Sequence, residues 1–216
     1  MKPKAFENVL LYAITDRRLS GKSHAEIVDL LVRGGCRLIQ LREKTMLLEE
    51  FRKDAQEAVK VAKRFGATVI INDYVELVAE LGAAGVHLGQ DDTDVLRARS
   101  LLGKEALIGL STHSLEQALC AEQLPVDYIA VGPIYGSSTK PEACIEGDGL
   151  ELLRRVRPRV KKPIVAIGGI TAAKARDVLS AGADLVAMIS ELMRCEDLSS
   201  QVIKVLEALH SYNMTE

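Results

Sequence analysis

Hydrophobic residues gather along this chain in short unbroken runs that are separated by longer mixed segments. Eight runs of strand length occupy residues 9–14, 37–41, 68–71, 85–88, 106–110, 128–131, 164–167 and 185–189. Within each run the side chains are apolar on both faces, which is typical of parallel strands that are covered on both sides. The pattern therefore predicts a buried parallel sheet.

The segments between the runs have helical spacing. Apolar side chains recur three and four positions apart around residues 25–32, 51–62 and 175–179, which predicts helices with one buried face. Several of these segments end in glycine just before the next run, at Gly34-Gly35, Gly82 and Gly182. Glycine at that place supplies the left-handed conformation that closes a helix.

Eight strands joined by helical crossovers predict an α/β protein with a single (β/α)8 TIM barrel over residues 1–216, near the short end for that fold. The alternative is an open doubly wound sheet. Such a sheet usually has fewer strands and often a glycine-rich first turn, which this chain lacks. The sequence contains no low-complexity linker that would mark a second domain.

Composition narrows the function classes. The formal net charge is −2 and aromatic residues make up 4% with no tryptophan, so neither nucleic acid nor a membrane surface is an expected partner. Cys36, Cys120, Cys144 and Cys195 are scattered without metal-ligand spacing and are interpreted as reduced thiols. The opening MKPKAFENVLLYAITD is interpreted as a first strand, not a signal peptide. We expect a soluble cytoplasmic protein that works alone or as a homo-oligomer.

A barrel places functional groups just after its strands, at one rim. Asn72 and Asp73 follow the third run, and Asp91 and Asp92 follow the fourth, so two neighbouring strand ends carry carboxylates. Hard divalent cations such as Mg²⁺ prefer these oxygen ligands. The alternative is that Asp73 and Asp92 only cap the helices that follow them.

Positive groups follow the second run. Gln40 and Arg42 alternate to the same side of the strand, toward the barrel interior, and Lys44 comes shortly after. A guanidinium and an ammonium beside a metal site suit a diphosphate. The alternative is a solvated charged turn, which is plausible for Glu43 but does not suit a Gln and an Arg on a strand.

A second anion site is predicted on the opposite side of the rim. The segment after the sixth run carries Ser137, Ser138, Thr139 and Lys140, and the seventh run ends in Gly168-Gly169. Backbone N–H groups in such turns, together with those after the eighth run, form the phosphate site that many barrels carry.

The sequence contains no convincing nucleophile. Ser111 follows the fifth run and could donate a hydrogen bond, whereas Ser114 is placed to cap the next helix. His87 is interpreted as a hydrogen-bonded core residue. His113 remains open as an acid or base.

These residues resemble those of a known family. The segments that carry the resemblance are Tyr12–Asp16, Gln40-Leu41-Arg42-Glu43-Lys44, Ile71-Asn72-Asp73, Gly85-Val86-His87-Leu88-Gly89-Gln90-Asp91-Asp92, Ser111-Thr112-His113-Ser114, Thr139-Lys140 and Ala166-Ile167-Gly168-Gly169-Ile170. In order and spacing they are similar to thiamine phosphate synthase. That family is a Mg²⁺-dependent (β/α)8 barrel that joins hydroxymethylpyrimidine diphosphate to thiazole phosphate and releases pyrophosphate.

The resemblance implies a role for each matching position. The pyrimidine diphosphate would be held by Gln40, Leu41, Arg42, Glu43, Lys44, Asn72, Ser111 and Lys140. Asp73 and Asp92 would bind Mg²⁺. The thiazole phosphate would be held by Ser137, Ser138, Thr139, Gly169, Ile189 and Ser190. The catalytic set would be Arg42, Lys44, Lys140 and Ser111, which stabilise the departing diphosphate without forming a covalent intermediate.

One segment departs from the family. Gly136-Ser137-Ser138 stands where threonine and proline are common, which puts the thiazole phosphate contacts in doubt.

Two relatives by fold remain as alternatives: a thiazole tautomerase that uses His113, and a barrel that binds thiamine phosphate without turnover. Another phosphate-substrate isomerase is disfavoured by the paired carboxylates Asp73 and Asp92.

Overall fold

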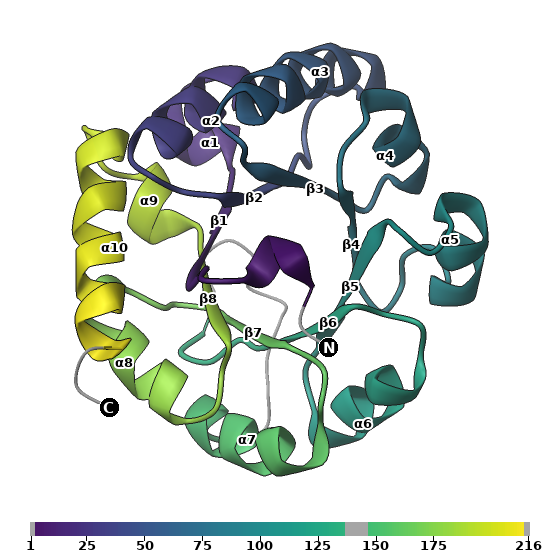
Figure 1. Cartoon of the computed structure of the whole chain (residues 1–216), viewed down its shortest axis with the longest axis vertical. Coiled ribbons are helices and arrows are strands. Elements are labelled where there is room, and N and C mark those ends of the chain that lie inside the picture. The colour runs from purple at the N-terminus through teal and green to yellow at the C-terminus, as the bar shows by residue number, and fades with distance from the viewer. Residues whose placement is uncertain (1–2, 137–146, 214–216) are drawn as a thin grey trace.

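Eight parallel strands close into a barrel in the order of the sequence (Figure 1). The computed structural model describes residues 3–136 and 147–213. The strands are β1 (Leu11–Ile14), β2 (Leu38–Leu41), β3 (Thr68–Asn72), β4 (Gly85–Leu88), β5 (Leu107–Thr112), β6 (Tyr128–Val131), β7 (Ile164–Ile167) and β8 (Leu185–Met188). The pairing of β1 with β8 closes the barrel, so the prediction of a (β/α)8 barrel is confirmed and the open sheet is excluded.

Helices surround the barrel as an outer ring (Figure 1). They are α1 (Arg17–Ser20), α2 (His24–Arg33), α3 (Leu48–Arg64), α4 (Val75–Leu81), α5 (Val95–Leu102), α6 (Leu115–Gln123), α7 (Gly149–Val156), α8 (Ala172–Ser180), α9 (Ser190–Met193) and α10 (Leu198–Asn213), with short 3-10 turns η1 (Lys4–Phe6) and η2 (Arg157–Arg159). The last helix, α10, packs against α2 and α8, which completes the ring.

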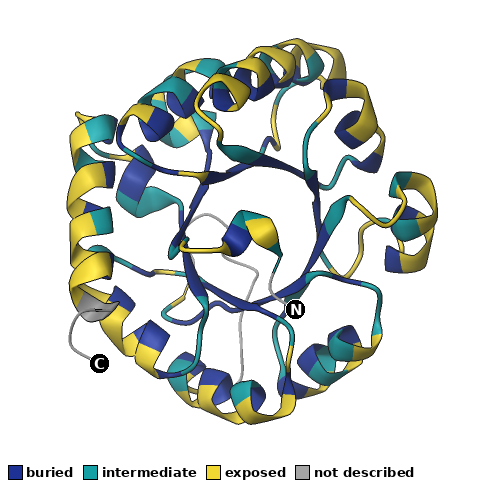
Figure 2. Cartoon of the chain, in the orientation of Figure 1, coloured by how far each residue is buried: buried dark blue, intermediate teal, exposed yellow. Residues whose placement is uncertain are grey.

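The unbroken apolar runs reflect burial on both faces of the strands. In β1, Leu11 and Ala13 belong to the core between barrel and helices, whereas Tyr12 and Ile14 belong to a separate cluster inside the barrel. The strands are almost wholly buried, while the helices are buried on one face only (Figure 2). Alternation within a strand thus supplies two cores from one run of apolar residues.

The helix ends carry the glycines that the sequence suggested. Gly35, Gly82 and Gly182 all adopt positive φ angles in the turns after α2, α4 and α8. Their lack of a β-carbon allows the chain to turn from helix to strand.

The N-terminal segment closes one end of the barrel. In Figure 1 the short turn η1 lies over the centre of the ring. Its Phe6 is fully buried, and the Phe6 ring lies 5.1 Å from that of Tyr128, centroid to centroid. Phe6 therefore belongs to the interior cluster and fills the barrel below the strand ends.

The fifth strand extends further than its hydrophobic pattern. Ser111 and Thr112 pair with Ala130 and Val131 of β6, so they belong to β5 and do not follow it. The reason is that backbone pairing continues after the apolar run has ended. Ser111 is consequently held by a strand and not by a loop.

The described residues carry two further features that bear on the sequence analysis. None of the helices within residues 3–136 and 147–213 combines the length and hydropathy that a transmembrane span requires. Cys36, Cys120 and Cys195 are free thiols, and Cys144 lies outside the described residues.

The buried position of Phe6 generates a stability prediction. Phe6→Ala should lower the free energy of unfolding by roughly 3–5 kcal/mol, because it removes a fully buried aromatic ring and leaves a cavity. Urea unfolding followed by circular dichroism measures this. The control is Phe65→Ala, whose ring is 39% exposed and which should cost about 1 kcal/mol or less. Equal losses in the two variants would contradict the role of Phe6.

Candidate active site

A cavity of about 490 Å³ opens at the rim formed by the C-terminal ends of the strands. It collects residues that are far apart in the sequence but were predicted to act together. Those predicted residues that line it are Gln40, Arg42, Lys44, Asn72, Asp73, Asp92, Ser111, Gly169, Ile189 and Ser190. The fold therefore brings these residues together at one rim, as the sequence predicts.

Two predicted residues lie outside the cavity lining. Leu41 packs in the core between the barrel and the helices, since it alternates away from Gln40 and Arg42. Glu43 is buried in the turn after β2. The predicted residues Ser137, Ser138, Thr139 and Lys140 lie outside the described residues.

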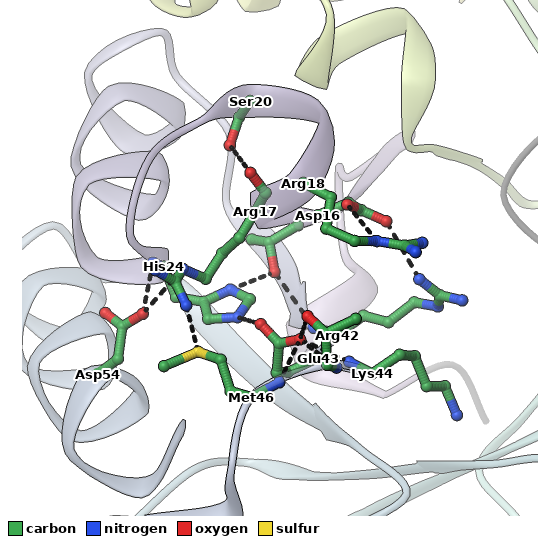
Figure 3. Close-up of polar contacts among 12 residues, drawn as sticks. Asp16, Arg17, Arg18, Ser20, His24, Arg42, Glu43, Lys44, Met46 and Asp54 are labelled. Carbon is green, nitrogen blue, oxygen red and sulfur yellow. Dashed lines mark hydrogen bonds and ion pairs between the residues drawn. The ribbon is translucent and has the colours of Figure 1, made fainter. Parts of the chain in front are cut away.

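The Arg42 side chain is held by a carboxylate from the first strand end (Figure 3). Its guanidinium lies 3.2 Å from Asp16 Oδ2, and Arg18 approaches the other oxygen of Asp16 at 3.9 Å. Asp16 also accepts a hydrogen bond from Leu19 N and so caps α1. This ion pair could not be recognised in the sequence, because a helix cap and a carboxylate that holds a ligand-binding cation have the same sequence signature.

Glu43 organises the turn that carries the cations (Figure 3). Its Oε1 accepts hydrogen bonds from the backbone N–H groups of Lys44, Thr45 and Met46 at 2.7, 2.7 and 3.2 Å, and from the Thr45 hydroxyl at 2.8 Å. Burial alone would raise the pKa of Glu43, but these bonds outweigh it and lower the pKa to about 2. Glu43 is thus a structural anion beside the cavity.

A buried histidine connects this turn to the end of β1. Thr15 Oγ1 accepts a hydrogen bond from Arg42 N at 3.2 Å and lies 2.8 Å from His24 Nδ1. His24 Nε2 lies 3.4 Å from Glu43 Oε2. Burial lowers the pKa of His24, against the opposing effect of Asp54 and Glu43. This string of polar contacts fixes the backbone of Arg42.

The paired carboxylates line the cavity and do not cap the helices that follow them. The N-caps of α4 and α5 are Tyr74 and Asp94, so the capping interpretation of Asp73 and Asp92 is wrong. Lys44 Nζ lies 2.6 Å from Asp73 Oδ2, and Asp92 Oδ2 accepts a hydrogen bond from Gly89 N at 2.6 Å. Burial raises the pKa of Asp73, Lys44 lowers it, and the neighbouring Asp92 carboxylate raises it again.

This donor set suits a metal ion that is shared with a ligand. Within residues 3–136 and 147–213 no group of three or more His, Cys, Asp or Glu side chains forms a complete metal site. Asp73 and Asp92 offer carboxylate oxygens from neighbouring strand ends, and their mutual repulsion favours a cation between them. Mg²⁺ typically uses one or two carboxylates together with substrate phosphates.

Across the rim, the chain turns tightly after β7. Gly168 and Gly169 have φ angles of 105° and 61°. A β-carbon on Gly169 would lie 3.0 Å from the Tyr135 carbonyl oxygen, a tight contact, so both conformation and space favour glycine. Ile189 is the N-cap of α9 and Ser190 its first residue. Gly168, Gly169, Ile189 and Ser190 all line this side of the cavity.

The histidines and serines of the rim have distinct contacts. Ser114 caps α6 as predicted, accepting a hydrogen bond from Gln117 N at 3.2 Å. His113 lines the cavity, and its Nδ1 lies 2.6 Å from the Gly132 carbonyl oxygen. His87 is buried and hydrogen-bonded, as the sequence suggested.

Comparison with known proteins identifies the family. The family described as thiamine monophosphate synthase matches residues 11–192. The chain belongs to the thiamine monophosphate synthase family. A thiamine-phosphate synthase from Chloroflexus aurantiacus is 41% identical over 191 residues, which is 88% of each chain. One from Nitrosococcus oceani is 40% identical over 206 residues, which is 94% of each chain.

A solved structure of the same family has the same architecture. The thiamine phosphate pyrophosphorylase from Pyrococcus furiosus superposes with a TM-score of 0.87 at 33% identity, over 96% of this chain and 98% of that one. The resemblance inferred from the motifs of the thiamine monophosphate synthase family is therefore confirmed. The match spans all eight strands, from the start of β1 at Leu11 to beyond β8.

The depressed pKa of Glu43 generates a pH prediction. A carboxyl group whose pKa is about 2 in the folded state, against an ordinary 4.5, stabilises the fold above about pH 4.5 and loses that contribution as the pH falls toward 2. Glu43→Gln should therefore unfold more easily than the wild type at pH 7, and the difference should shrink as the pH falls below 4.5. Urea titrations at pH 7, 4.5 and 3 measure it.

The control for this experiment is Glu57→Gln, which removes an exposed carboxylate on α3 that pairs only with Lys60 among the described residues. Its effect on unfolding should be small and nearly independent of pH. A Glu43→Gln penalty that stays constant down to pH 3 would contradict the assignment of the low pKa to Glu43.

Proposed function

We propose that the protein is a thiamine phosphate synthase acting in thiamine biosynthesis. It would transfer the pyrimidinylmethyl group of hydroxymethylpyrimidine diphosphate to thiazole phosphate, and the oxygen would leave with the diphosphate. The bond between the methylene carbon and the diphosphate oxygen breaks, and a bond from that carbon to the thiazole nitrogen forms. The products are thiamine phosphate and pyrophosphate.

The observation that carries this proposal is the meeting of cations and carboxylates at three neighbouring strand ends. Arg42 and Lys44 follow β2, Asp73 follows β3 and Asp92 follows β4, and all four line the cavity. A diphosphate accompanied by Mg²⁺ satisfies both sets of charges. A purely anionic or purely cationic ligand would leave one set uncompensated.

The chemistry requires stabilisation of the leaving group and alignment of the two rings. The aminopyrimidine ring stabilises the cation that forms as diphosphate departs, so the protein needs no nucleophile. Arg42 and Lys44 lie at the cavity wall, already oriented by Asp16 and Asp73. Donors fixed in advance stabilise developing charge without reorganising during the reaction. Lys140, if it reaches the same anion, adds to them.

Asp73 and Asp92 would hold Mg²⁺ together with the phosphate oxygens. The ion supplies Lewis-acid stabilisation of charge on the departing diphosphate. Gln40, Asn72 and Ser111 add hydrogen-bonding groups to the same side of the cavity. The second substrate would place its phosphate on the backbone amides near Gly169, Ile189 and Ser190, with Ser137, Ser138 and Thr139 as further donors.

Pyrophosphate release tests the function directly. Purified protein given both substrates and Mg²⁺ should release pyrophosphate and form thiamine phosphate in equal amounts, and excess EDTA should stop both. Omitting thiazole phosphate is the control for simple hydrolysis of the diphosphate. No release by folded protein with verified substrates would refute the proposal.

The metal assignment yields a specific prediction. Asp92→Asn should reduce kcat/KM at least about 100-fold, equivalent to about 2.7 kcal/mol of transition-state stabilisation, because a neutral amide is a poor Mg²⁺ ligand. The matched control is Asp94→Asn, which lies two positions away, caps α5 and keeps its capping ability. Activity of Asp92→Asn within threefold of Asp94→Asn would remove Asp92 from the metal site.

One observation favours a second candidate, a thiazole tautomerase. A carbonyl oxygen accepts hydrogen bonds, so the 2.6 Å contact with Gly132 places the hydrogen of neutral His113 on Nδ1 and leaves Nε2 as a base. A tautomerase needs such a base and no diphosphate. Isomerisation of a thiazole carboxylate phosphate that is lost in His113→Gln, without pyrophosphate release, would favour this function.

A further inference from the structure

A chain of hydrogen bonds crosses the interior of the barrel and borders the cavity. It runs from Gln40 Nε2 to the Tyr12 hydroxyl at 3.0 Å, and from there to the Tyr128 hydroxyl at 3.0 Å. The Tyr128 hydroxyl lies 2.9 Å from His87 Nδ1, and His87 Nε2 lies 2.9 Å from Ser111 Oγ. Its two ends, Gln40 on β2 and Ser111 on β5, line the cavity, as do Tyr12 and His87, whereas Tyr128 lies behind the lining.

The contact between His87 and Tyr128, in the middle of the hydrogen-bond chain, depends on the absence of a side chain at Gly109. His87, Gly109 and Tyr128 occupy one row across β4, β5 and β6. A β-carbon on Gly109 would lie 2.0 Å from Tyr128 Cζ, so only glycine allows the phenol to extend across β5. The rings of His87 and Tyr128 stack with centroids 5.5 Å apart as a result. The register of β4, β5 and β6 therefore determines the contact between His87 and Tyr128.

The hydrogens in this chain have a defined direction. Among the residues that the structure describes, the Tyr12 hydroxyl contacts Gln40 and Tyr128, and Gln40 donates to it. A buried hydroxyl needs a partner for its own hydrogen, so Tyr12 donates to Tyr128. Tyr128 in turn donates to His87 Nδ1, which places the imidazole hydrogen on Nε2.

The last link acts on Ser111. His87 Nε2 donates to Ser111 Oγ, which therefore accepts from below and keeps its own hydrogen for the cavity. The backbone of Ser111 is held as well, because Gln90 Nε2 donates to its carbonyl oxygen at 2.6 Å. Burial raises the pKa of both Tyr12 and Tyr128, so neither phenol ionises near neutral pH and each link keeps its hydrogen.

We propose that Tyr12, Tyr128 and His87 are positioning residues whose hydrogen-bond chain fixes Ser111 as a donor toward the anionic leaving group. The same chain couples Ser111 to Gln40, since reversing the Gln40 amide would reverse every link and turn the Ser111 hydrogen inward. This inference rests on the proposed function for the identity of the anion. The hydrogen-bond chain from Gln40 to Ser111, called the relay below, is defined by contacts within the barrel.

A double-mutant cycle tests the relay. Tyr128→Phe removes one oxygen and keeps the ring, and it should lower kcat/KM for pyrophosphate release about tenfold. In a Ser111→Ala background the same substitution should change kcat/KM less than about twofold, because the residue through which it acts is gone. Equal effects in both backgrounds, or no effect in the first, would overturn the proposal. A structural defect would persist in both backgrounds.

A conservative pair tests the histidine link. His87→Gln can place an amide nitrogen near the position of Nε2 and donate to Ser111, whereas His87→Asn reaches only the Nδ1 side. His87→Gln should therefore retain several-fold more activity than His87→Asn. The reverse order, with both variants folded by circular dichroism, would contradict the relay. Tyr74→Phe is the control for loss of a phenol hydroxyl, since Tyr74 contacts Phe51 by its ring and takes no part in the chain.

A binding measurement on the wild type and on the Tyr128 and Ser111 variants can show whether the relay or the proposed function has failed. Binding of inorganic pyrophosphate with Mg²⁺, measured by calorimetry, does not need turnover. If the wild type binds pyrophosphate but forms no product, the proposed function fails, and the relay is judged by whether the Tyr128→Phe effect on Kd vanishes in Ser111→Ala. Absence of both binding and turnover in the wild type overturns both proposals.

Discussion

Closure of the barrel by eight parallel pairings is the constraint on which the site depends. Because every strand runs in the same direction, all the C-terminal ends meet at one rim, and consecutive strands become neighbours there. Lys44 after β2 can then reach Asp73 after β3, although the two are far apart in sequence. A slip of one residue in any strand would turn its cavity-lining side chains into the helical layer.

Opposite charges are already paired at the cavity wall. Asp16 pairs with Arg42, and Asp73 pairs with Lys44, so each cation has a carboxylate partner of its own. The proposed diphosphate would compete with these carboxylates for the cations, which would cost part of its binding energy. In return, the cationic side chains lose little rotamer freedom when the ligand arrives. The arrangement favours a ligand that brings its own cation for the carboxylates.

Much of this architecture could be predicted from sequence because burial on both faces leaves unbroken apolar runs. The inward direction of Gln40 and Arg42 followed from strand alternation, and pairing of β2 with β3 placed them beside Asp73. The relay could not be predicted. Tyr12 and Tyr128 are indistinguishable from core aromatics by pattern, and their contact depends on barrel register. The contacts of Glu43 could not be predicted for a similar reason, since only the folded turn shows that it is buried and that Oε1 accepts from backbone amides.

Phe6 and η1 fill one end of the barrel, which limits the routes by which small molecules can reach the cavity. With one end filled by interior side chains and η1, substrates and products share the opposite rim as their route. A ligand that contacts Gln40, Tyr12 or His87, all of which line the cavity, reaches them through this rim. Anything that covers this rim therefore slows arrival at the cavity and departure from it alike.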